Sequence, residues 1–301
     1  MSSKAESATA TKRAPHPAAR DTIFVEDARV LAHQAWDGDQ YILRLHAPET
    51  ARHAMPGSFV HLRCDPLLPM RRPMSIMRAN PEDGKIDILY KAHGVGTRLL
   101  AKRKIDEVIS LIGPIGVPFK LQGYRKYPLL IGGGVGIPPM IFLAEHMKEG
   151  NENIKPLVIM GSEVPFPFKT RPSQIMVAGI PDGVIATLQL LEDWNIPARL
   201  ASLQGYPGCF DGYVTDLARH WLDGLGKDEL EQVEIFSCGP TPMLKAVAAL
   251  ARDYNLPCQV SLEENMACAV GGCAGCVVRV ETPNGPAMKR ICVDGPVFDA
   301  A

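Results

Sequence analysis

The stretch Leu129-Leu130-Ile131-Gly132-Gly133-Gly134-Val135-Gly136-Ile137-Pro138 predicts a buried strand, a glycine turn and the start of a helix. Such a turn leaves free backbone N–H groups at the helix N-terminus, which form a natural seat for a pyrophosphate. Pro138 suits the first helical turn, where a missing N–H has no consequence. The stretch lacks the strict G-x-G-x-x-G spacing. A tight turn that only packs a helix on a sheet therefore remains the alternative.

Apolar runs alternate with helix-length windows on both sides of this stretch, from residue 127 to about residue 254. The runs are 129–131, 157–160, 184–188 and 233–237, and the windows are 138–148, 211–222 and 241–253. This alternation predicts a parallel sheet covered by helices. A second strand-to-helix turn contains Cys238 and Gly239, with Thr241 as N-cap. Two such turns at the ends of strands in one sheet form the crevice in which doubly wound folds bind nucleotides.

Residues 22 to 118 show short strands separated by turns instead. The strands expected are 42–46, 58–63, 75–78, 86–90 and 108–112. Strands of this length with few helical windows predict a small closed antiparallel β-barrel. We expect a disordered tail at 1–20, the barrel at 21–123, the α/β domain at 124–256 and a small C-terminal module at 257–301.

Two segments of the expected barrel carry groups that suit a phosphate. Arg71-Arg72-Pro73-Met74-Ser75 places an arginine, a proline of fixed φ and a hydroxyl at a strand start. The alternative is an exposed basic edge strand guarded by proline. In the segment 90–97, Gly96 and Thr97 precede a helical window at 98–104 and offer donors to a phosphate. An ordinary capped helix explains that segment equally well.

Four cysteines near the C-terminus are spaced Cys268-x4-Cys273-x2-Cys276-x15-Cys292. This is the spacing of a plant-type 2Fe–2S cluster, in which three thiolates lie on one loop and the fourth comes from later in the chain. The glycines at 271, 272 and 275 let the backbone wrap closely around the inorganic sulfurs. A structural zinc site is the rival, although zinc usually takes two C-x2-C pairs and the second is missing here. A disulfide framework is disfavoured because no secretory context is visible.

The bulk composition favours a cytoplasmic protein that binds neither nucleic acid nor membrane. The 301 residues carry a net charge of −1, so no strong field attracts polyanions or anionic lipid. The longest apolar stretch, 129–144, is interrupted by four glycines and two prolines and is not a membrane span. Residues 1–20 lack an apolar signal region, and an organelle transit peptide is the alternative to a disordered tail. Single cysteines at 64, 209, 238 and 258 are expected to be reduced and buried.

Taken in this order, the motifs resemble those of the electron-transfer subunits of two-subunit, NAD-linked dihydroorotate dehydrogenases, within the ferredoxin-reductase-like superfamily. The stretches that carry the resemblance are R-P-M-S at 72–75, G-V-G-T at 94–97, the glycine turn at 132–138, C-G-P at 238–240, E-E-N-M-A-C at 263–268 and C-V-D-G-P-V-F at 292–298. The resemblance spans about residues 22 to 298. It is most specific in the cysteine module.

The resemblance implies an FAD, a 2Fe–2S cluster and NAD as cofactors. Its implied FAD-holding residues are Arg72, Pro73, Met74 and Ser75, with Leu89, Tyr90 and Lys91 along the flavin and Gly96 and Thr97 at its diphosphate. Its implied nucleotide-binding residues are Gly132, Gly133, Gly134, Gly136, Cys238 and Gly239. It also implies an FMN-containing catalytic dihydroorotate dehydrogenase subunit as partner in a heterotetramer for pyrimidine biosynthesis. This chain then carries electrons between the partner's FMN and NAD.

The chain departs from the family pattern in three places. Ala269 stands where glycine is usual, and 201–205 lacks the usual acidic residues, which leaves the choice between NAD and NADP open. The proline-rich insertion 163–180 has no assignment. Lys289 and Arg290 are hypothesised to lie near the docking surface, with a solvated charge pair as the alternative.

Two other functions fit the motifs. One is a flavin and iron–sulfur reductase subunit of a hydrogenase or of a ferredoxin–NADP transhydrogenase. The other is a protein that binds zinc and a nucleotide without redox turnover.

Overall fold

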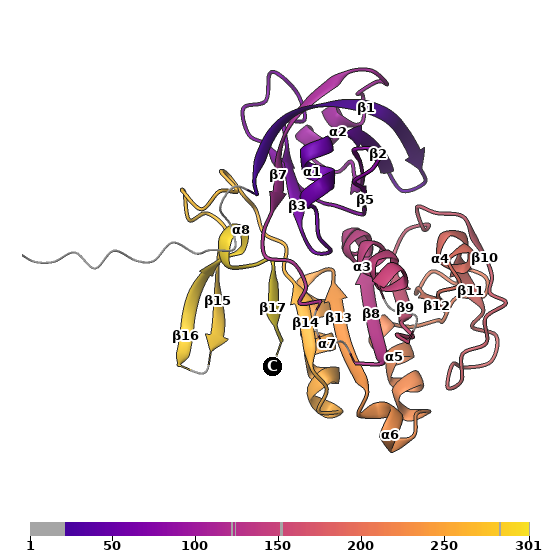
Figure 1. Ribbon diagram of the computed structural model, residues 1–301. Coiled ribbons are helices and arrows are strands. Elements are labelled where there is room, and N and C mark those ends of the chain that lie inside the picture. Colours follow the sequence, from indigo (N-terminus) through magenta and orange to yellow (C-terminus); the bar gives the residue numbers. More distant parts are fainter. Residues whose placement is uncertain (1–21, 122, 124, 151–152, 283, 301) are drawn as a thin grey trace, which may run out of the picture.

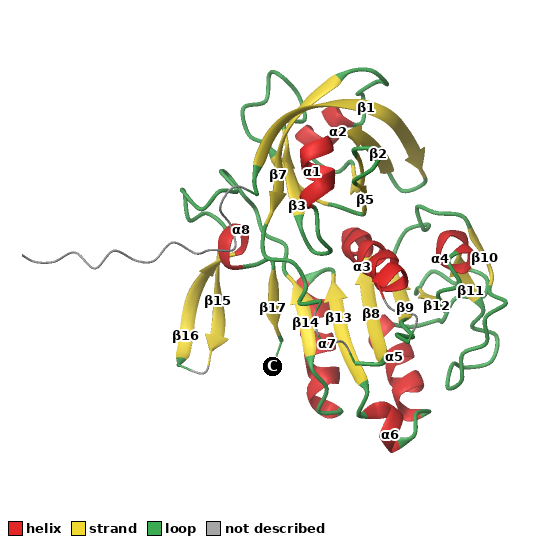
Figure 2. Cartoon of the chain, in the orientation of Figure 1, coloured by secondary structure: helices red, strands yellow, loops and turns green. Residues whose placement is uncertain are grey.

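The computed structural model describes residues 22–121, 123, 125–150, 153–282 and 284–300. The predicted tail at 1–20 lies outside these residues. A curled antiparallel sheet packs above a mainly parallel sheet, and a small C-terminal unit lies beside both (Figure 1). Figure 2 shows that helices cover both faces of the parallel sheet. The fold class predicted from the sequence is therefore confirmed.

The antiparallel sheet has seven strands in the order β4-β3-β7-β1-β2-β6-β5. Their bounds are β1 Phe24–Trp36, β2 Gln40–His46, β3 Phe59–Leu62, β4 Arg72–Ser75, β5 Arg78–Asn80, β6 Lys85–Lys91 and β7 Val108–Ile115. Register shifts in β1 and β3 bend the sheet, so that alternate side chains enclose one apolar core. The predicted closure was wrong: β4 and β5 are the two edges of the hydrogen-bonded order. The strand predicted at 75–78 is divided between them.

The second sheet has the order β12-β9-β8-β13-β14-β17, with all neighbours parallel except β17. Its strands are β8 Tyr127–Gly133, β9 Leu157–Gly161, β12 Ala198–Ala201, β13 Val233–Cys238, β14 Cys258–Ser261 and β17 Val297–Asp299. The strand predicted at 184–188 was misplaced: β11 (Ala186–Leu188) pairs with β10 (Thr170–Pro172) outside this sheet. Strand β12 was missed because its four residues include a charged one, Arg199.

Eight helices are assigned within the described residues. They are α1 Pro48–His53, α2 Val95–Leu100, α3 Ile137–Gly150, α4 Gln189–Asp193, α5 Val214–Asp223, α6 Lys227–Leu230, α7 Thr241–Asp253 and α8 Ile291–Asp294. Alternate strand residues face opposite ways: Leu130 packs with α3 and Leu129 with α5 and α7. In the described part of the chain, no helix has the length and apolarity that crossing a membrane requires.

The C-terminal residues form a hairpin of β15 (Val277–Thr282) and β16 (Gly285–Arg290), which projects from the body (Figure 1). The cysteine loop that precedes it packs on the antiparallel sheet. Phe59 and Ile115 of that sheet share one apolar cluster with Ala269 and Ile291. The C-terminal unit is therefore anchored on both sheets, because β17 also pairs with β14.

Candidate functional site

One pocket of about 440 Å³ lies where the two sheets meet the cysteine module. This volume falls within the roughly 300–1,000 Å³ typical of ligand pockets. The predicted site residues that line it are Arg72, Pro73, Met74, Ser75, Leu89, Tyr90, Lys91 and Thr97. Val135 of the glycine turn and the segment 261–266 line it as well. Regions far apart in the sequence thus share one cavity.

The pocket joins the two phosphate-compatible segments of the antiparallel sheet. A Cβ on Gly96 would lie 3.1 Å from Arg72 Nε, so the glycine lets the guanidinium rest against the start of α2. Arg72 Nη1 donates to the carbonyls of Met70 and Arg71, at 3.0 Å each, which fixes its direction. Arg71 points elsewhere and donates to the Ser110 carbonyl at 2.7 Å. Arg72 therefore supplies a positive charge to this pocket, and Arg71 supports the sheet.

The three predicted residues at the end of β6 lie in three different environments. Leu89 packs with side chains of the parallel sheet, whereas Tyr90 packs in the core of the curled sheet. The Tyr90 hydroxyl lies 2.8 Å from His33 Nε2, and burial raises the pKa of this phenol. Lys91 stays half-buried at the pocket edge. This strand end offers the pocket an apolar surface and one cation.

The two glycine turns lie against each other at the ends of β8 and β13. A Cβ on Gly136 would lie 2.1 Å from the Cys238 carbonyl oxygen, and one on Gly133 would lie 2.5 Å from Met243 Sδ. Gly132 and Gly239 are also buried. Only Gly134, with φ +55° and nothing within 4 Å of a Cβ position, is open to solvent among the six residues predicted here. The buried glycines allow close packing, and Gly134 with Val135 forms the accessible surface.

The four cysteines are arranged as two pairs. The Cys276 and Cys292 sulfurs lie 3.3 Å apart, and the Cys273 N–H donates to Cys268 Sγ at 3.4 Å. Each iron of a 2Fe–2S cluster takes two of the four thiolates. The paired arrangement therefore fits the two-iron cluster.

The loop environment favours thiolate at its exposed end. Desolvation raises the pKa of the Cys268 thiol, but N–H groups of Val270, Cys273 and Gly272 and the Cys273 side chain lower it to about 7. Burial and the neighbouring Cys276 raise the pKa of Cys292 to about 12. Arg290 Nη1 donates to the Gly271 carbonyl at 2.9 Å and so supports the loop.

The sequence analysis placed residues 263–268 in the cluster module but assigned none of the connector 262–267, between β14 and the cysteine loop, to the pocket. Glu263 and Met266 line the pocket. Desolvation by the surrounding protein raises the pKa of the Glu263 carboxyl. Burial and then the nearby Glu263 charge raise the pKa of the Cys238 thiol. The only available signal was position, because these residues directly precede Cys268.

Comparisons with known proteins agree with this geometry. A family model for the iron-sulfur cluster binding domain of dihydroorotate dehydrogenase B matches residues 263–301. The dihydroorotate dehydrogenase B (NAD(+)) electron transfer subunit of Shouchella clausii is 31% identical over 264 residues, which cover 86% of this chain and 90% of that protein. The subunit of the same name from a Geobacillus species is 32% identical, with coverages of 91% and 96%.

Two solved structures share the fold. One, described for flavin-based electron bifurcation by an NADH-dependent reduced ferredoxin-NADP oxidoreductase, has a TM-score of 0.70 at 26% identity and covers 91% of this chain and 88% of that chain. The ferredoxin reductase of carbazole 1,9a-dioxygenase has a TM-score of 0.57 at 21% identity, with coverages of 77% and 65%.

A buried histidine lies on β3, next to the pocket strand β4. His61 of β3 pairs with Pro73 of β4, is 1% exposed, and has no hydrogen-bond partner for either ring nitrogen among the described residues. Burial and the charge of Arg71 lower its pKa to about 4, against the weaker effect of the Arg71 and Met266 backbone. At neutral pH the His61 imidazole is therefore uncharged.

We expect His61 to make the fold sensitive to mild acid. Its folded pKa lies below its unfolded value of about 6.5, so the unfolded chain binds the proton more tightly and stability falls as pH drops from about 6.5 towards 4. Between pH 7 and 5 this single group removes about 2 kcal/mol from the free energy of unfolding. Urea unfolding of His61→Phe should show a pH dependence weaker by that amount. The exposed-site variant His46→Phe serves as control, and equal pH dependence in wild type and His61→Phe would contradict the assignment.

Proposed function

The chain belongs to the family of dihydroorotate dehydrogenase B electron transfer subunits, and we propose that it carries electrons between a dihydroorotate-oxidising partner and NAD through a 2Fe–2S cluster and an FAD. One observation carries the proposal. A single pocket is lined by the flavin motif, by Val135 of the nucleotide turn and by the connector that leads to Cys268. We assign flavin binding to residues 21–123, nucleotide binding to 124–256 and cluster binding to 257–301.

The FAD is assigned to the pocket side of the antiparallel sheet. The residues that hold it are Arg72, Pro73, Met74, Ser75, Leu89, Tyr90, Lys91, Gly96 and Thr97. Arg72 supplies charge for the diphosphate, beside the start of α2. Leu89 supplies an apolar surface that keeps water away from the flavin ring. These roles are supported by the way the pocket gathers all but one of these residues, and by the contact of that one, Gly96, with Arg72.

The nicotinamide nucleotide is assigned to the crevice above the two glycine turns. Gly134 and Val135 offer the accessible backbone, while Gly132, Gly133, Gly136, Cys238 and Gly239 hold the turns together. The cluster is assigned to Cys268, Cys273, Cys276 and Cys292. When bound, the flavin supplies the exchange between two-electron hydride chemistry and one-electron transfer. The chain's own residues bind, orient and shield these groups.

The partner supplies the oxidation itself. Conversion of dihydroorotate to orotate releases two electrons and two protons, and NAD⁺ takes up two electrons and one proton to become NADH. We assign the partner as an FMN-containing catalytic subunit in a heterotetramer. Lys289 and Arg290 each lie 3.9 Å from the Asp294 carboxylate, so both are partly neutralised. Four further cysteines, at 64, 209, 238 and 258, carry free thiols, which suits the reducing cytoplasm.

A second function is favoured by one comparison. The solved chain described for NADH-dependent reduced ferredoxin-NADP oxidoreductase is similar over most of its length. The motifs of this chain also fit a transhydrogenase subunit of that kind, which would serve a different partner. Co-purification from the native organism separates the two: a dihydroorotate-oxidising subunit supports the first function, and a pyridine-nucleotide reductase supports the second.

Replacing one cluster ligand should stop electron transfer beyond the flavin and leave flavin reduction by NADH intact. We expect Cys273→Ser to remove the iron–sulfur absorbance and transfer to the partner, while NADH still reduces the flavin, because the assigned flavin and nucleotide residues lie outside the cysteine loop. Visible spectra and iron content report the cluster, ferricyanide-coupled NADH oxidation reports flavin reduction, and NAD-dependent orotate formation with the partner reports transfer. Cys209→Ser, which removes a half-buried thiol elsewhere, is the control. Retention of the cluster bands in Cys273→Ser would contradict the ligand assignment.

Separating the two glycine turns should displace the bound nucleotide and leave the FAD and the cluster in place. In Gly136→Ala the new Cβ would meet the Cys238 carbonyl at 2.1 Å, so the turns must move apart. We expect the rate of flavin reduction by NADH to fall roughly 10- to 100-fold, as for other misplacements of about 1 Å. FAD and iron contents should remain those of wild type.

Gly150→Ala, at the opposite end of α3 with nothing within 4 Å of its Cβ position, is the matched control. Coincident stopped-flow traces for Gly136→Ala and Gly150→Ala would contradict the assignment of the nucleotide site to this crevice.

A further inference from the structure

Helix α3 belongs to the cores of both sheets. Phe142 of α3 is buried in the core of the curled sheet. In the other direction, Met77, between β4 and β5, and Leu89 of β6 are buried in the core that α3 forms with the parallel sheet. The glycine turn at 134–136 leads directly into this helix. Any tilt of α3 against the curled sheet therefore moves the turn that faces the pocket.

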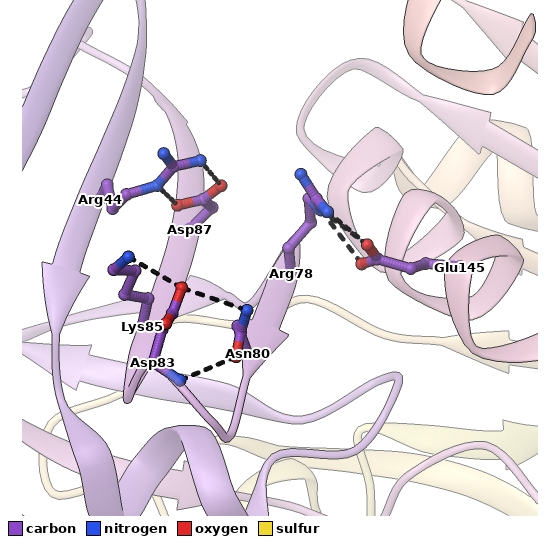
Figure 3. Close-up of polar contacts among 7 residues, drawn as sticks. All are labelled: Arg44, Arg78, Asn80, Asp83, Lys85, Asp87 and Glu145. Carbon is purple, nitrogen blue, oxygen red and sulfur yellow. Dashed lines mark hydrogen bonds and ion pairs between the residues drawn. The ribbon is translucent and has the colours of Figure 1, made fainter. Parts of the chain in front are cut away.

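An ion pair connects the far half of α3 to the curled sheet (Figure 3). Arg78 of β5 donates through Nε to both Glu145 oxygens, at 3.0 and 3.1 Å, and through Nη2 to Oε1. The two side chains are 34% and 14% exposed. The Arg78 guanidinium also lies 5.1 Å from the ring centre of Trp194, which follows α4. Two-point contact of this kind fixes direction as well as distance.

A second polar contact crosses between the sheets at another place. Gln40, 6% exposed at the start of β2, donates through Nε2 to the Pro165 carbonyl at 2.7 Å. Gly38 lies against Val164 next to it, where a Cβ would be only 3.0 Å away. Pro165 belongs to the insertion at 163–180 that the sequence left unassigned. The Arg78–Glu145 pair alone would still allow α3 and its sheet to rotate about it against the curled sheet. The Gln40–Pro165 contact removes that freedom.

We propose that Arg78 and Glu145 are positioning residues that set the place of the nucleotide turn relative to the flavin pocket, with Gln40 and Pro165 preventing rotation. The inference rests on the proposed function, because what it positions is the nicotinamide nucleotide against the flavin. Glu145 lies about 12 Å along α3 from Ile137, at about 1.5 Å per residue. A helix of this length is stiff enough to transmit a tilt from the ion pair to the turn.

The rival interpretation is that the ion pair only adds stability. Figure 3 contains the comparison that separates the two, because Arg44 and Asp87 form a similar two-bond pair, at 2.7 Å each, within the curled sheet. Loss of either pair removes a similar interaction. The Arg78–Glu145 pair joins α3 to the curled sheet, whereas the Arg44–Asp87 pair lies within that sheet, so only loss of the first pair loosens α3 against the curled sheet.

The experiment uses anaerobically purified full-length protein with its cofactors. The variants are Arg78→Lys, Glu145→Gln and the charge-reversed double variant Arg78→Glu/Glu145→Arg, with Arg44→Lys as the control. Stopped-flow absorbance gives the flavin reduction rate at saturating NADH and the apparent Kd for NADH. Hydrogen–deuterium exchange of peptides covering residues 132–140 reports the turn directly, independently of turnover. FAD and iron contents are measured on every sample.

We expect each single variant to lower the saturating reduction rate about 10-fold, by displacing the reacting groups by a fraction of the roughly 1 Å that costs 100-fold. Exchange at 134–138 should become faster, while FAD and iron contents stay at the wild-type level. The double variant should recover most of the rate, and Arg44→Lys should match wild type.

Unchanged rate and exchange in both single variants would overturn the inference, as would an equal effect of Arg44→Lys. If NADH fails to reduce the wild-type flavin, the proposed function falls. The exchange comparison still decides the positioning role in that case: faster exchange at 134–138 in the Arg78 and Glu145 variants alone supports it, and unchanged exchange overturns it.

Discussion

The short connector between β14 and Cys268 is the constraint on which the arrangement depends. β14 ends at Ser261, at the same edge of the parallel sheet as the two glycine turns. Six residues then reach the first cysteine, so the cysteine loop lies at most about 24 Å from that edge. The same six residues line the pocket beside the flavin motif, apart from Ala267. The length of the connector therefore keeps the cysteine loop near the nucleotide turns, and the shared pocket brings the flavin motif to the same connector.

Packing converts this proximity into a fixed geometry. The cysteine loop rests on Phe59 and Ile115 of the curled sheet, and β17 returns to pair with β14. Within the loop, Ala269 adopts φ +59° although it is 1% exposed. Glycine would enter this left-handed conformation without strain. The unusual alanine thus keeps the same turn, and its methyl group contributes to the apolar cluster under the cysteines.

The sequence predicted local features well and long-range contacts poorly. The helix at 241–253 and the strand at 233–237 were predicted closely because their apolar residues follow a regular period. The curled sheet's long first strand was missed because charged residues such as Glu26 and Arg29 interrupt its pattern. The place of Glu263 and its neighbours in the pocket was not predicted, because a polar connector has no hydrophobic period that would indicate where it lies. Arg78 and Glu145 resemble ordinary surface charges, and only the fold brings residues 67 positions apart into contact.

The central claim is that electrons from the nicotinamide reach a two-iron cluster held by this chain. Low-temperature electron paramagnetic resonance of the isolated anaerobic protein, reduced with NADH alone, tests it most directly. The account predicts the signal of a reduced 2Fe–2S cluster, equal in shape to the signal obtained with dithionite. A cluster that dithionite reduces and NADH leaves silent, with the FAD in place, would contradict it.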